Sequence, residues 1–575
     1  MKYTKRIILA SLALLLGSCT QKYYKTAAYH HNYRNLIDSY IYEASNVRKI
    51  EKPALQTKAA ALSHKQQWWT QEITKNLFPS AKQENINPLS LYSGALKHSP
   101  QVKVFSELPL IREASIEEAT GRFDVHVFLE SKWEKNRNPR SSISQTADSV
   151  FHEEEYSVEA GLKRKLETGG ELVVSQRFSH LDDNSISLSP NAQAKSNFTV
   201  SFLQPLLKGA GVKYNTSIID IAKLDVRTAD EEFKRQITSH LSQVNSSYWA
   251  LYLARAQYLI NKRLHDETQE ITQKLQKRGD IDTVKSQLLR AEAALAKRET
   301  TLIRSEISIK NTESRLKILV NSPKLKRATQ IELLPNYHPQ IIEYKESLKQ
   351  VLVTALKNRP EIDQAFLQLQ ALDIRKDMAN NELLPQLNLI LESSYGGLDH
   401  DTSYGDSYNK QWGHDSYLAG LSYDFPIQNR AAKARYRRRN LEFRQQMEQI
   451  NATIDTTLFE VKVSYRELET ARREIAARYK SLMASTNELK SIKKRWDIAE
   501  LRAEKGGATY MQFLLDSQER KAEAEESYLK SLVHYSVAME NLERAKGTLL
   551  QFNKVRSSRT VDETNHLPTN NVFME

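Results

Sequence analysis

The residues of this chain that could carry out chemistry are few, and their spacing does not suit catalysis. His152-Glu153-Glu154-Glu155 has no second histidine at helical spacing, so it lacks the arrangement of a zinc protease. The pair His30-His31 has no third ligand, and two adjacent imidazoles alone do not predict a metal site. The sequence contains no nucleophile elbow, P-loop or dinucleotide-binding fingerprint. We therefore expect a protein that is not an enzyme and holds no metal or other cofactor.

Cys19 is the one residue whose sequence context clearly predicts a chemical modification, and it is the only cysteine. A basic start and an apolar run at residues 7–16 predict an export signal that is too short to remain as a membrane span. The letters LGSC at residues 16–19 resemble the cleavage box of a bacterial lipoprotein. By that resemblance residues 1–18 are a signal peptide, and Cys19 becomes an N-terminus that carries covalent lipid such as palmitate. Thr20, where such lipoproteins can have aspartate, favours the outer membrane. The alternative is a cysteine that follows an ordinary signal peptide by chance.

The composition narrows the remaining classes of function. The chain has 575 residues, of which 27% are charged, and it has 17 glycines, a mean hydropathy of -0.59 and a net charge of +13. A positive excess can indicate affinity for an anionic surface, but solvated helix faces slightly richer in Lys and Arg produce it as well. Because the sequence has no recognition helix, zinc pattern or aromatic-basic platform, we expect no nucleic-acid partner.

Two long helical hairpins are the elements that must position everything else. Residues 431–504 contain neither proline nor glycine and predict a helix about 110 Å long. After Gly506-Gly507 a return helix follows, with a heptad pattern typical of helices that pack against neighbours. A similar pattern occurs in an earlier return helix. The heptad positions are Leu514, Ser517, Lys521, Ala524, Tyr528, Ser531, Tyr535, Ala538, Leu542, Ala545 and Leu549, and earlier Leu288, Ala291, Leu295, Arg298, Leu302, Ser305, Ile309, Thr312 and Leu316.

The chain contains one structural plan written twice. The stretch from Ala95 to Pro100, ALKHSP, recurs as ALKNRP from Ala355 to Pro360. Between a lipidated N-terminal extension (19–88) and a polar C-terminal tail (551–575) we predict two repeats. The first, 89–321, holds a helix, strands at about 123–133 and 196–205, a long helix at 212–278 and a return helix at 282–321. The second, 322–550, holds a helix at 343–383, strands at about 386–395 and 416–425, a long helix at 431–504 and a return helix at 510–550.

Each predicted strand alternates between apolar and polar residues, as in Phe198, Val200 and Phe202. Strands of about ten residues with one apolar face fit a tilted bilayer crossing, although a soluble β-sandwich alternates in the same way. Four such strands cannot close around a pore, so several chains would have to pool them. The first repeat also holds an inserted hairpin at about 152–180, around Gly169-Gly170. If this hairpin lies outside the sheet, three chains give twelve strands, and if it joins the sheet they give eighteen.

A basic run follows the last predicted strand. It is suited to gripping anionic headgroups at the inner rim of a membrane, whereas the alternative is a solvated start of a helix. Its members are Arg430, Lys433, Arg435, Arg437, Arg438 and Arg439.

Over about residues 89–550 the chain resembles the TolC family of outer-membrane efflux proteins. The most specific motifs are the twin AL…P stretches, QPLLKG at 204–209, SYWALY at 247–252 and the segment from Gly506 to Gln518. The resemblance implies a mainly α fold with a transmembrane β-barrel, in which four amphipathic strands per chain form a twelve-strand barrel in a homotrimer. An α-helical tunnel then continues through the periplasm of a Gram-negative bacterium. The implied function is the exit duct of a tripartite efflux or type I secretion system. Its implied partners are a periplasmic adaptor and an inner-membrane transporter of the RND or ABC type.

Members of that family narrow the tunnel with acidic rings near the start of the last helix. Asp516 matches the second aspartate of that motif, whereas Phe513 occupies the position of the first. Asp280 and Asp282 lie near the equivalent turn of the first repeat. The resemblance therefore implies a constriction formed by these aspartates, and the alternative for Asp516 is an ordinary solvated helix residue.

The alternative function is a lipid-anchored periplasmic coiled-coil tether without a channel. Such a tether accounts for Cys19 and the long helices, but it does not account for the amphipathic strands or for the repeat.

Overall fold

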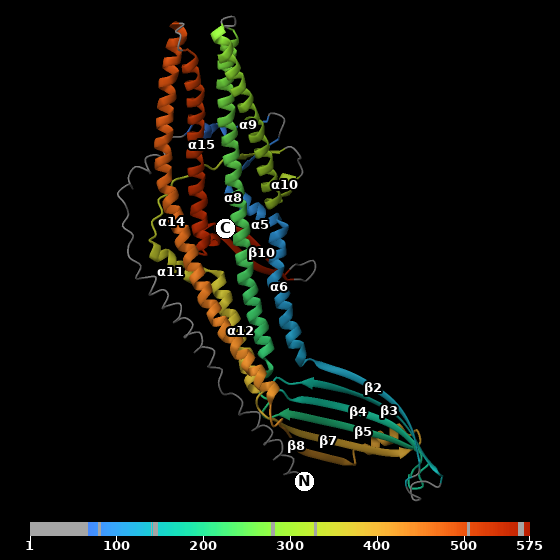
Figure 1. Cartoon of the computed structure of the whole chain (residues 1–575). Coiled ribbons are helices and arrows are strands. Elements are labelled where there is room, and N and C mark those ends of the chain that lie inside the picture. The colour runs from blue at the N-terminus through green and yellow to red at the C-terminus, as the bar shows by residue number, and fades with distance from the viewer. Residues whose placement is uncertain are drawn as a thin grey trace. The chain divides into compact units, whose positions relative to one another are not determined.

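The computed structural model describes residues 67–78, 82–139, 141, 148–277, 282–326, 331–502, 507–561 and 568–574. Within this part, both halves of the chain contribute to each of two units. One unit contains Ile111–Thr228 and Ala365–Gln449 and carries the large sheet of Figure 1. The other contains Ala229–Gln364, Ile450–Glu575 and the segment that ends at Leu110, and it is mostly helical.

The sheet has six antiparallel strands, which are the four predicted strands and the two strands of the inserted hairpin. Their order is β2-β3-β4-β5-β7-β8, so the inserted hairpin lies inside the sheet, and β2 and β8 are its edges (Figure 1). Of the two arrangements that the sequence left open, the structure has the one in which the hairpin joins the sheet. The strands are β2 (Val125–Pro139), β3 (Val150–Lys165), β4 (Glu171–Asp183), β5 (Gln193–Pro205), β7 (Gln386–His400) and β8 (Asp415–Asp424).

A tight turn joins β3 to β4 and fixes the hairpin to the base of the sheet. Gly169 adopts φ 91°, and a Cβ there would lie 2.4 Å from the carbonyl oxygen of Gly209, so glycine is required. The amide of Gly211 donates to the carbonyl of Thr168 at 3.0 Å, and the Thr168 hydroxyl donates to Gln204 at 3.0 Å. The inserted hairpin is thus bonded at its turn as well as along both strands.

The helices follow the doubled plan, with breaks that the prolines explain. The predicted helix at 343–383 is two helices, because Pro360 disfavours a helical conformation of Arg359, whose ψ is 118°. Pro100 acts in the same way on Ser99. None of the helices in the described ranges combines the length and apolar character that a bilayer crossing requires. The helices are α4 (Trp68–Glu72), α5 (Pro88–His98), α6 (Pro100–Thr120), α7 (Val212–Asn215), α8 (Ser217–Gln276), α9 (Asp282–Val320), α10 (Pro323–Lys326), α11 (Leu348–Asn358), α12 (Pro360–Asn381), α13 (Tyr404–Gln411), α14 (Arg430–Arg502), α15 (Gly507–Ala545) and α16 (Leu549–Phe552).

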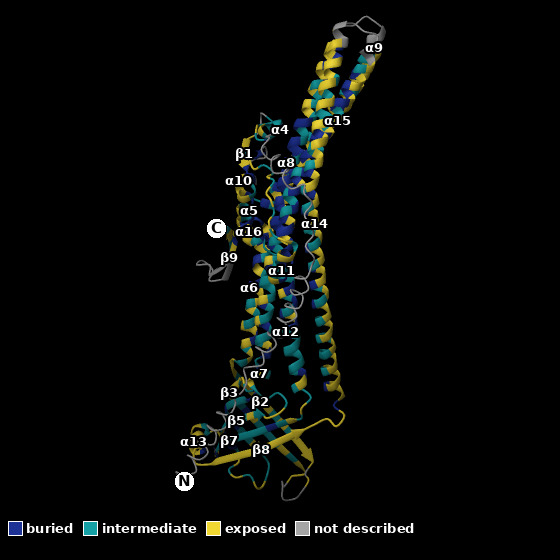
Figure 2. Ribbon diagram, turned by 90° about the vertical axis from the view of Figure 1, so that its left-hand side faces the viewer, coloured by how far each residue is buried: buried dark blue, intermediate teal, exposed yellow. Residues whose placement is uncertain are grey.

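The heptad residues of α15 form the core of the helical unit, whose buried residues are dark blue in Figure 2. Every predicted position from Leu514 to Leu549 is buried except Lys521, which is partly buried. No predicted heptad position of α9 is exposed. The SYWALY motif lies on α8 in the same core, where Trp249 packs edge-on against Tyr248 with ring centroids 5.1 Å apart.

Both segments that flank the predicted repeats contain helices or strands within the described residues. The extension predicted at 19–88 contains α4 and β1 (Lys82–Ile86), and β1 pairs in parallel with β6 (Ile331–Pro335). The polar tail predicted at 551–575 contains an antiparallel hairpin of β9 (Val555–Val561) and β10 (Pro568–Met574). These segments fold because their few apolar side chains reach the core. Trp69, Ile73 and Val555 are buried in it, and Val572 and Met574 pack against it.

Candidate functional site

The sheet presents one mainly apolar face and one mainly polar face across all six strands. Side chains directly opposite each other in antiparallel pairs share a face, and the faces alternate along each strand. On β5, Val200 lies opposite Val174 and Ser393, whereas its neighbour Ser201 lies opposite Val173 and Glu392. The apolar face includes Val127, Leu129, Trp133, Tyr156, Val158, Leu162, Leu172, Val174, Phe178, Phe198, Val200, Phe202, Leu387, Leu389, Leu391, Tyr417, Leu421 and Tyr423. The polar face includes His126, Glu130, Lys132, Glu155, Glu159, Lys163, Glu171, Arg177, Lys195, Asn197, Thr199, Ser201, Asn388, Glu392, Ser416 and Asp424.

Large apolar side chains are most exposed on the two edge strands. On β2, Val127 is 80% and Leu129 is 72% exposed, and on β8, Tyr417 is 70% and Leu421 is 69% exposed. Figure 2 shows β8 mostly in the colour of exposed residues. Exposed apolar side chains at both edges of one sheet indicate contact with lipid or with other protein surfaces.

A short helix that was not predicted, α13, covers one end of the apolar face. Its Gln411 is fully buried and accepts a hydrogen bond from the Ser196 hydroxyl at 2.7 Å, and both contact the amide of Gln176. Trp412, directly after α13, packs on Phe198 with ring centroids 5.6 Å apart. The two polar side chains of the strands are therefore satisfied beneath the helix.

We expect Gly397→Ala to displace α13 from the sheet. A Cβ on Gly397 would lie 1.8 Å from the carbonyl oxygen of Ser407, which is backbone and cannot rotate away. The expected cost is about 1–3 kcal/mol, typical of overpacking, and proteolysis within residues 401–414 of the detergent-solubilised protein measures it. Gly405→Ala is the matched control, since a Cβ there meets nothing within 4 Å. Equal protease resistance in both variants would contradict the prediction.

Near the start of α15 the helices α8, α9, α14 and α15 share a small second core, which includes Leu275, Ala291, Trp496 and Leu514. Arg298, a heptad residue of α9, is buried beside it. Its guanidinium donates to the Leu515 carbonyl at 2.9 Å, to the Gln518 side chain at 3.2 Å and to the Thr268 hydroxyl. Burial lowers the pKa of Arg298. This one side chain therefore joins three helices.

The structure describes only part of the predicted constriction. Asp516 is exposed on α15, and Phe513, one turn earlier, is 48% exposed. Asp280 lies outside the described residues. Asp282 is the first residue of α9, and its side chain also lies outside the description. The pore role of these aspartates stays a prediction.

The predicted basic run lies at the start of α14, directly after β8. Arg435 pairs with Glu382 at 3.2 Å, and Arg439 pairs with Glu442 at 2.7 Å. Arg438 lies 3.7 Å from the same Glu442. Arg430, Lys433 and Arg437 are exposed and make no ion pair to any described residue. Half of the cluster is thus available to anions.

Cys19 and the whole predicted signal peptide lie outside the described residues, so the lipid attachment stays a prediction.

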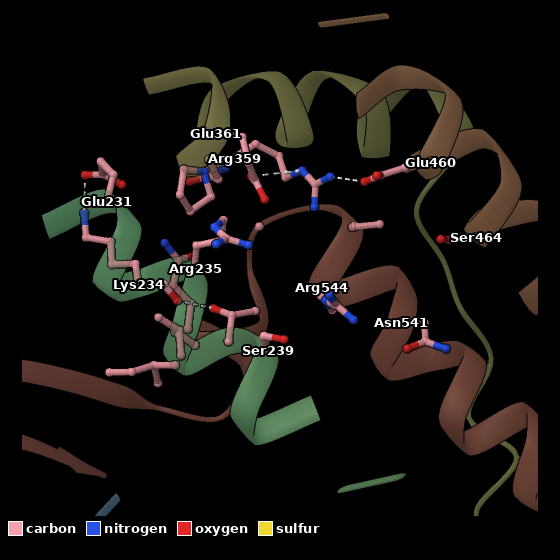
Figure 3. A pocket seen from close by; sticks show the side chains of 18 of the residues that line it. Glu231, Lys234, Arg235, Ser239, Arg359, Glu361, Glu460, Ser464, Asn541 and Arg544 are labelled. Atoms are coloured by element: carbon pink, nitrogen blue, oxygen red, sulfur yellow. Dashed lines mark hydrogen bonds and ion pairs between the residues drawn. The ribbon is translucent and has the colours of Figure 1, made fainter. Parts of the chain in front are cut away.

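A cavity of about 930 Å³ lies among helices of the helical unit, at the second AL…P motif. Figure 3 shows side chains that line it. Arg359 pairs with Glu460 and lies 3.5 Å from Glu361. Hydrogen bonds from Arg235 lower the pKa of Glu232 to about 2. Because these charged side chains are paired with one another, we interpret the cavity as a solvated recess and not as a catalytic centre. Within the described ranges, no group of three His, Cys, Asp or Glu side chains is placed to hold a metal.

A fully buried ion pair joins three distant segments of the helical unit. Arg255 of α8 donates to Glu332 of β6 at 2.6 Å, and both side chains are at most 1% exposed. The same guanidinium donates to the carbonyls of Ile73 at 3.0 Å and Lys75 at 2.7 Å. Glu332 also accepts from the amide of Leu77 at 3.0 Å. Sequence reasoning missed this pair, because neither residue lies in a motif.

The burial of His240 on α8 predicts that the folded core loses stability in acid. It is buried, neither ring nitrogen has a hydrogen bond of good geometry to the described chain, and burial lowers its pKa. The unfolded chain therefore binds the proton more readily. Stability is unaffected above pH ~6.5 and falls as the pH drops below that value. We expect His240→Leu to reduce the loss of stability between about pH 7 and 5, as measured by denaturant unfolding at each pH. An unchanged pH profile would contradict this.

Comparison with known proteins supports the fold. Residues 351–548 match the family model described as outer membrane efflux protein. The structure of CusC matches with a TM-score of 0.58 and 14% sequence identity, and the match covers 82% of this chain and 95% of the CusC chain. The CmeC outer membrane channel of Campylobacter jejuni has a TM-score of 0.56 and 14% identity, covering 83% and 91%. The outer membrane protein VceC of Vibrio cholerae has a TM-score of 0.56 and 16% identity, covering 80% and 96%. No curated protein matches the chain by sequence.

These matches confirm the resemblance inferred from the sequence, together with the mainly α fold class. They also agree with the expectation that the chain is not an enzyme, because the description of the matched family names efflux.

Proposed function

We propose that this chain, whose residues 351–548 match the outer membrane efflux protein family and whose fold is that of outer-membrane channels, forms an exit duct through the outer membrane. The observation that carries the proposal is the two-faced sheet. A mainly apolar face with a mainly polar face behind it suits a wall between lipid and an aqueous lumen.

The wall requires several copies of the chain. β2 and β8 are unpaired edges within the described sheet, and an open edge in lipid leaves backbone groups without partners. We propose a homotrimer, in which β8 of each copy pairs with β2 of the next. The directions fit, because an even number of antiparallel strands places oppositely directed strands at the two edges.

The duct receives its cargo from other proteins. We propose a periplasmic adaptor and an inner-membrane transporter of the RND or ABC type as partners, serving drug efflux or type I secretion. Co-purification of membrane-solubilised complexes tests the partnership. The genes beside this one indicate which kind of pump is served.

We further propose that Cys19 carries lipid and that the basic run grips headgroups where the sheet meets α14. Metabolic labelling with a palmitate analogue tests the first proposal. Cys19→Ser should abolish the label, and a label that persists would refute the attachment at this residue.

Asp516 is our candidate for the constriction, since three copies would concentrate negative potential at one level of a tunnel. Asp516→Asn should reduce cation selectivity in planar-bilayer recordings without changing the trimer.

The central experiment is extraction of the full chain from outer membranes, followed by a mass measurement of the detergent-solubilised protein and bilayer recording. A heat-modifiable trimer that conducts supports the proposal. A water-soluble monomer would overturn it and would favour the periplasmic tether.

A further inference from the structure

The inserted hairpin β3–β4 lies within the sheet that we assign to the membrane, and this changes the size of the exit. Resting on the duct function proposed above, we propose that each chain supplies six strands to an eighteen-strand barrel. Its lumen is wide enough for solutes too bulky for a twelve-strand barrel.

The apolar stripe of the hairpin is the first argument. Tyr156, Val158 and Leu162 of β3, with Leu172 and Val174 of β4, continue the apolar face of the neighbouring strands in register. A lid folded over the mouth of a barrel would contact water on both faces, so an apolar stripe on one face would not be expected.

The polar side of the hairpin is equally continuous. Glu159 lies opposite Glu130 on β2 and Arg177 on β4, and Lys163 forms an ion pair with Glu171 at 2.9 Å. Charged side chains in the middle of strands must face water, so this side belongs to the lumen.

The positions of the connections are the third argument. The β3–β4 turn is short and lies beside the Gly209–Gly211 segment that leads into α7. The β4–β5 connection, residues 184–192, is longer and lies at the other end of the strands. Short turns on the periplasmic side and longer loops outside are the pattern of outer-membrane barrels. The hairpin therefore crosses the bilayer as its neighbours do.

The number of strands sets the diameter of the barrel. Barrel diameter grows roughly in proportion to strand number, so eighteen strands give about 1.5 times the diameter of twelve, and barrels of 16–18 strands enclose an aqueous channel. Selection of cargo by size then falls to the helical part of the duct, not to the barrel.

Cysteine accessibility tests the proposal in trimers reconstituted into liposomes. Two neighbouring positions on β3, Glu159→Cys and Ala160→Cys, report on the polar and the apolar face of the hairpin. Glu392→Cys and Leu391→Cys on β7 report on the same faces of a strand that lies in the wall in either arrangement. A bulky, water-soluble maleimide is the probe, with the wild-type chain as the blank for Cys19.

The polar-face cysteine of each pair should react about tenfold faster than its neighbour or more, because lipid shields the apolar face. Equal reaction at 159 and 160 with alternation retained on β7 would overturn the eighteen-strand barrel while leaving the duct in place. Loss of alternation on β7 as well would refute the duct itself. A strand count by cryo-electron microscopy of the wild-type trimer is the second readout, and twelve strands would overturn the proposal.

Discussion

Val200→Arg will prevent the protein from assembling in the outer membrane, whereas Ser201→Arg, one residue further, will not. Val200 lies midway along β5 on the apolar face, and Ser201 lies on the polar face. An arginine facing lipid near the middle of the bilayer costs about 2–4 kcal/mol, and a homotrimer carries three copies. The same charge on a lumen-facing position remains in water.

The measurement is the amount of heat-modifiable trimer in isolated outer membranes, normalised to total expressed protein. Because both variants add the same side chain to neighbouring positions, each controls for the charge and size introduced in the other. If both variants assemble equally well, the apolar face does not contact lipid, and the proposed function loses its main support.

Arg255→Met will unfold the start of the helical unit. Methionine leaves the carboxylate of Glu332 buried without its cation, and it removes the donors to the carbonyls of Ile73 and Lys75. Breaking a buried pair on one side costs about 3–5 kcal/mol. We expect a large drop in the midpoint of denaturant unfolding, together with early proteolysis around residues 67–78.

Lys274→Met on the same helix is the control. Lys274 pairs with Glu270 at 3.1 Å, and both side chains are largely open to solvent. Exposed pairs contribute about 0–1 kcal/mol, so this variant should unfold close to the wild type. A similarly small effect for Arg255→Met would show that the buried pair does not hold the N-terminal segment. The double variant Arg255→Met/Glu332→Leu should recover part of the loss, because no buried charge then lacks a partner.

Local patterns in the sequence predict the elements that depend on local physics. The heptad positions of α15 from Leu514 to Ala545 are buried as predicted, apart from the partly buried Lys521, because a periodic stripe on a long helix has to face its neighbours. The apolar faces of β5 and β7 are also as predicted. The hydrogen bonding of Arg298 can also be predicted from the sequence, since a charged residue at a heptad core position must find partners.

The features that sequence reasoning missed depend on contacts between distant segments. Arg255 and Glu332 are separated by 77 residues, and the carbonyls that complete their network come from a third segment. The strands β3 and β4 join the sheet through their ladders with β2 and β5, and the periodicity of a single strand does not reveal which strands it pairs with. The helix α13 has only eight residues and is held by tertiary contacts with β5 and β7, so its own sequence predicts little.

The interleaving of the two repeats in the sheet has a consequence for biogenesis. β5 pairs with β7, and residues 206–385 lie between those strands. A chain exported from its N-terminus therefore presents β2 to β5 as an unfinished sheet, with an open edge at β5, while the intervening helices are still arriving. Such edges are sites of aggregation, and non-local pairing is slow. Truncations that end before β7 should accumulate as insoluble periplasmic material, and the full chain should depend on chaperones that hold it until β7 and β8 emerge.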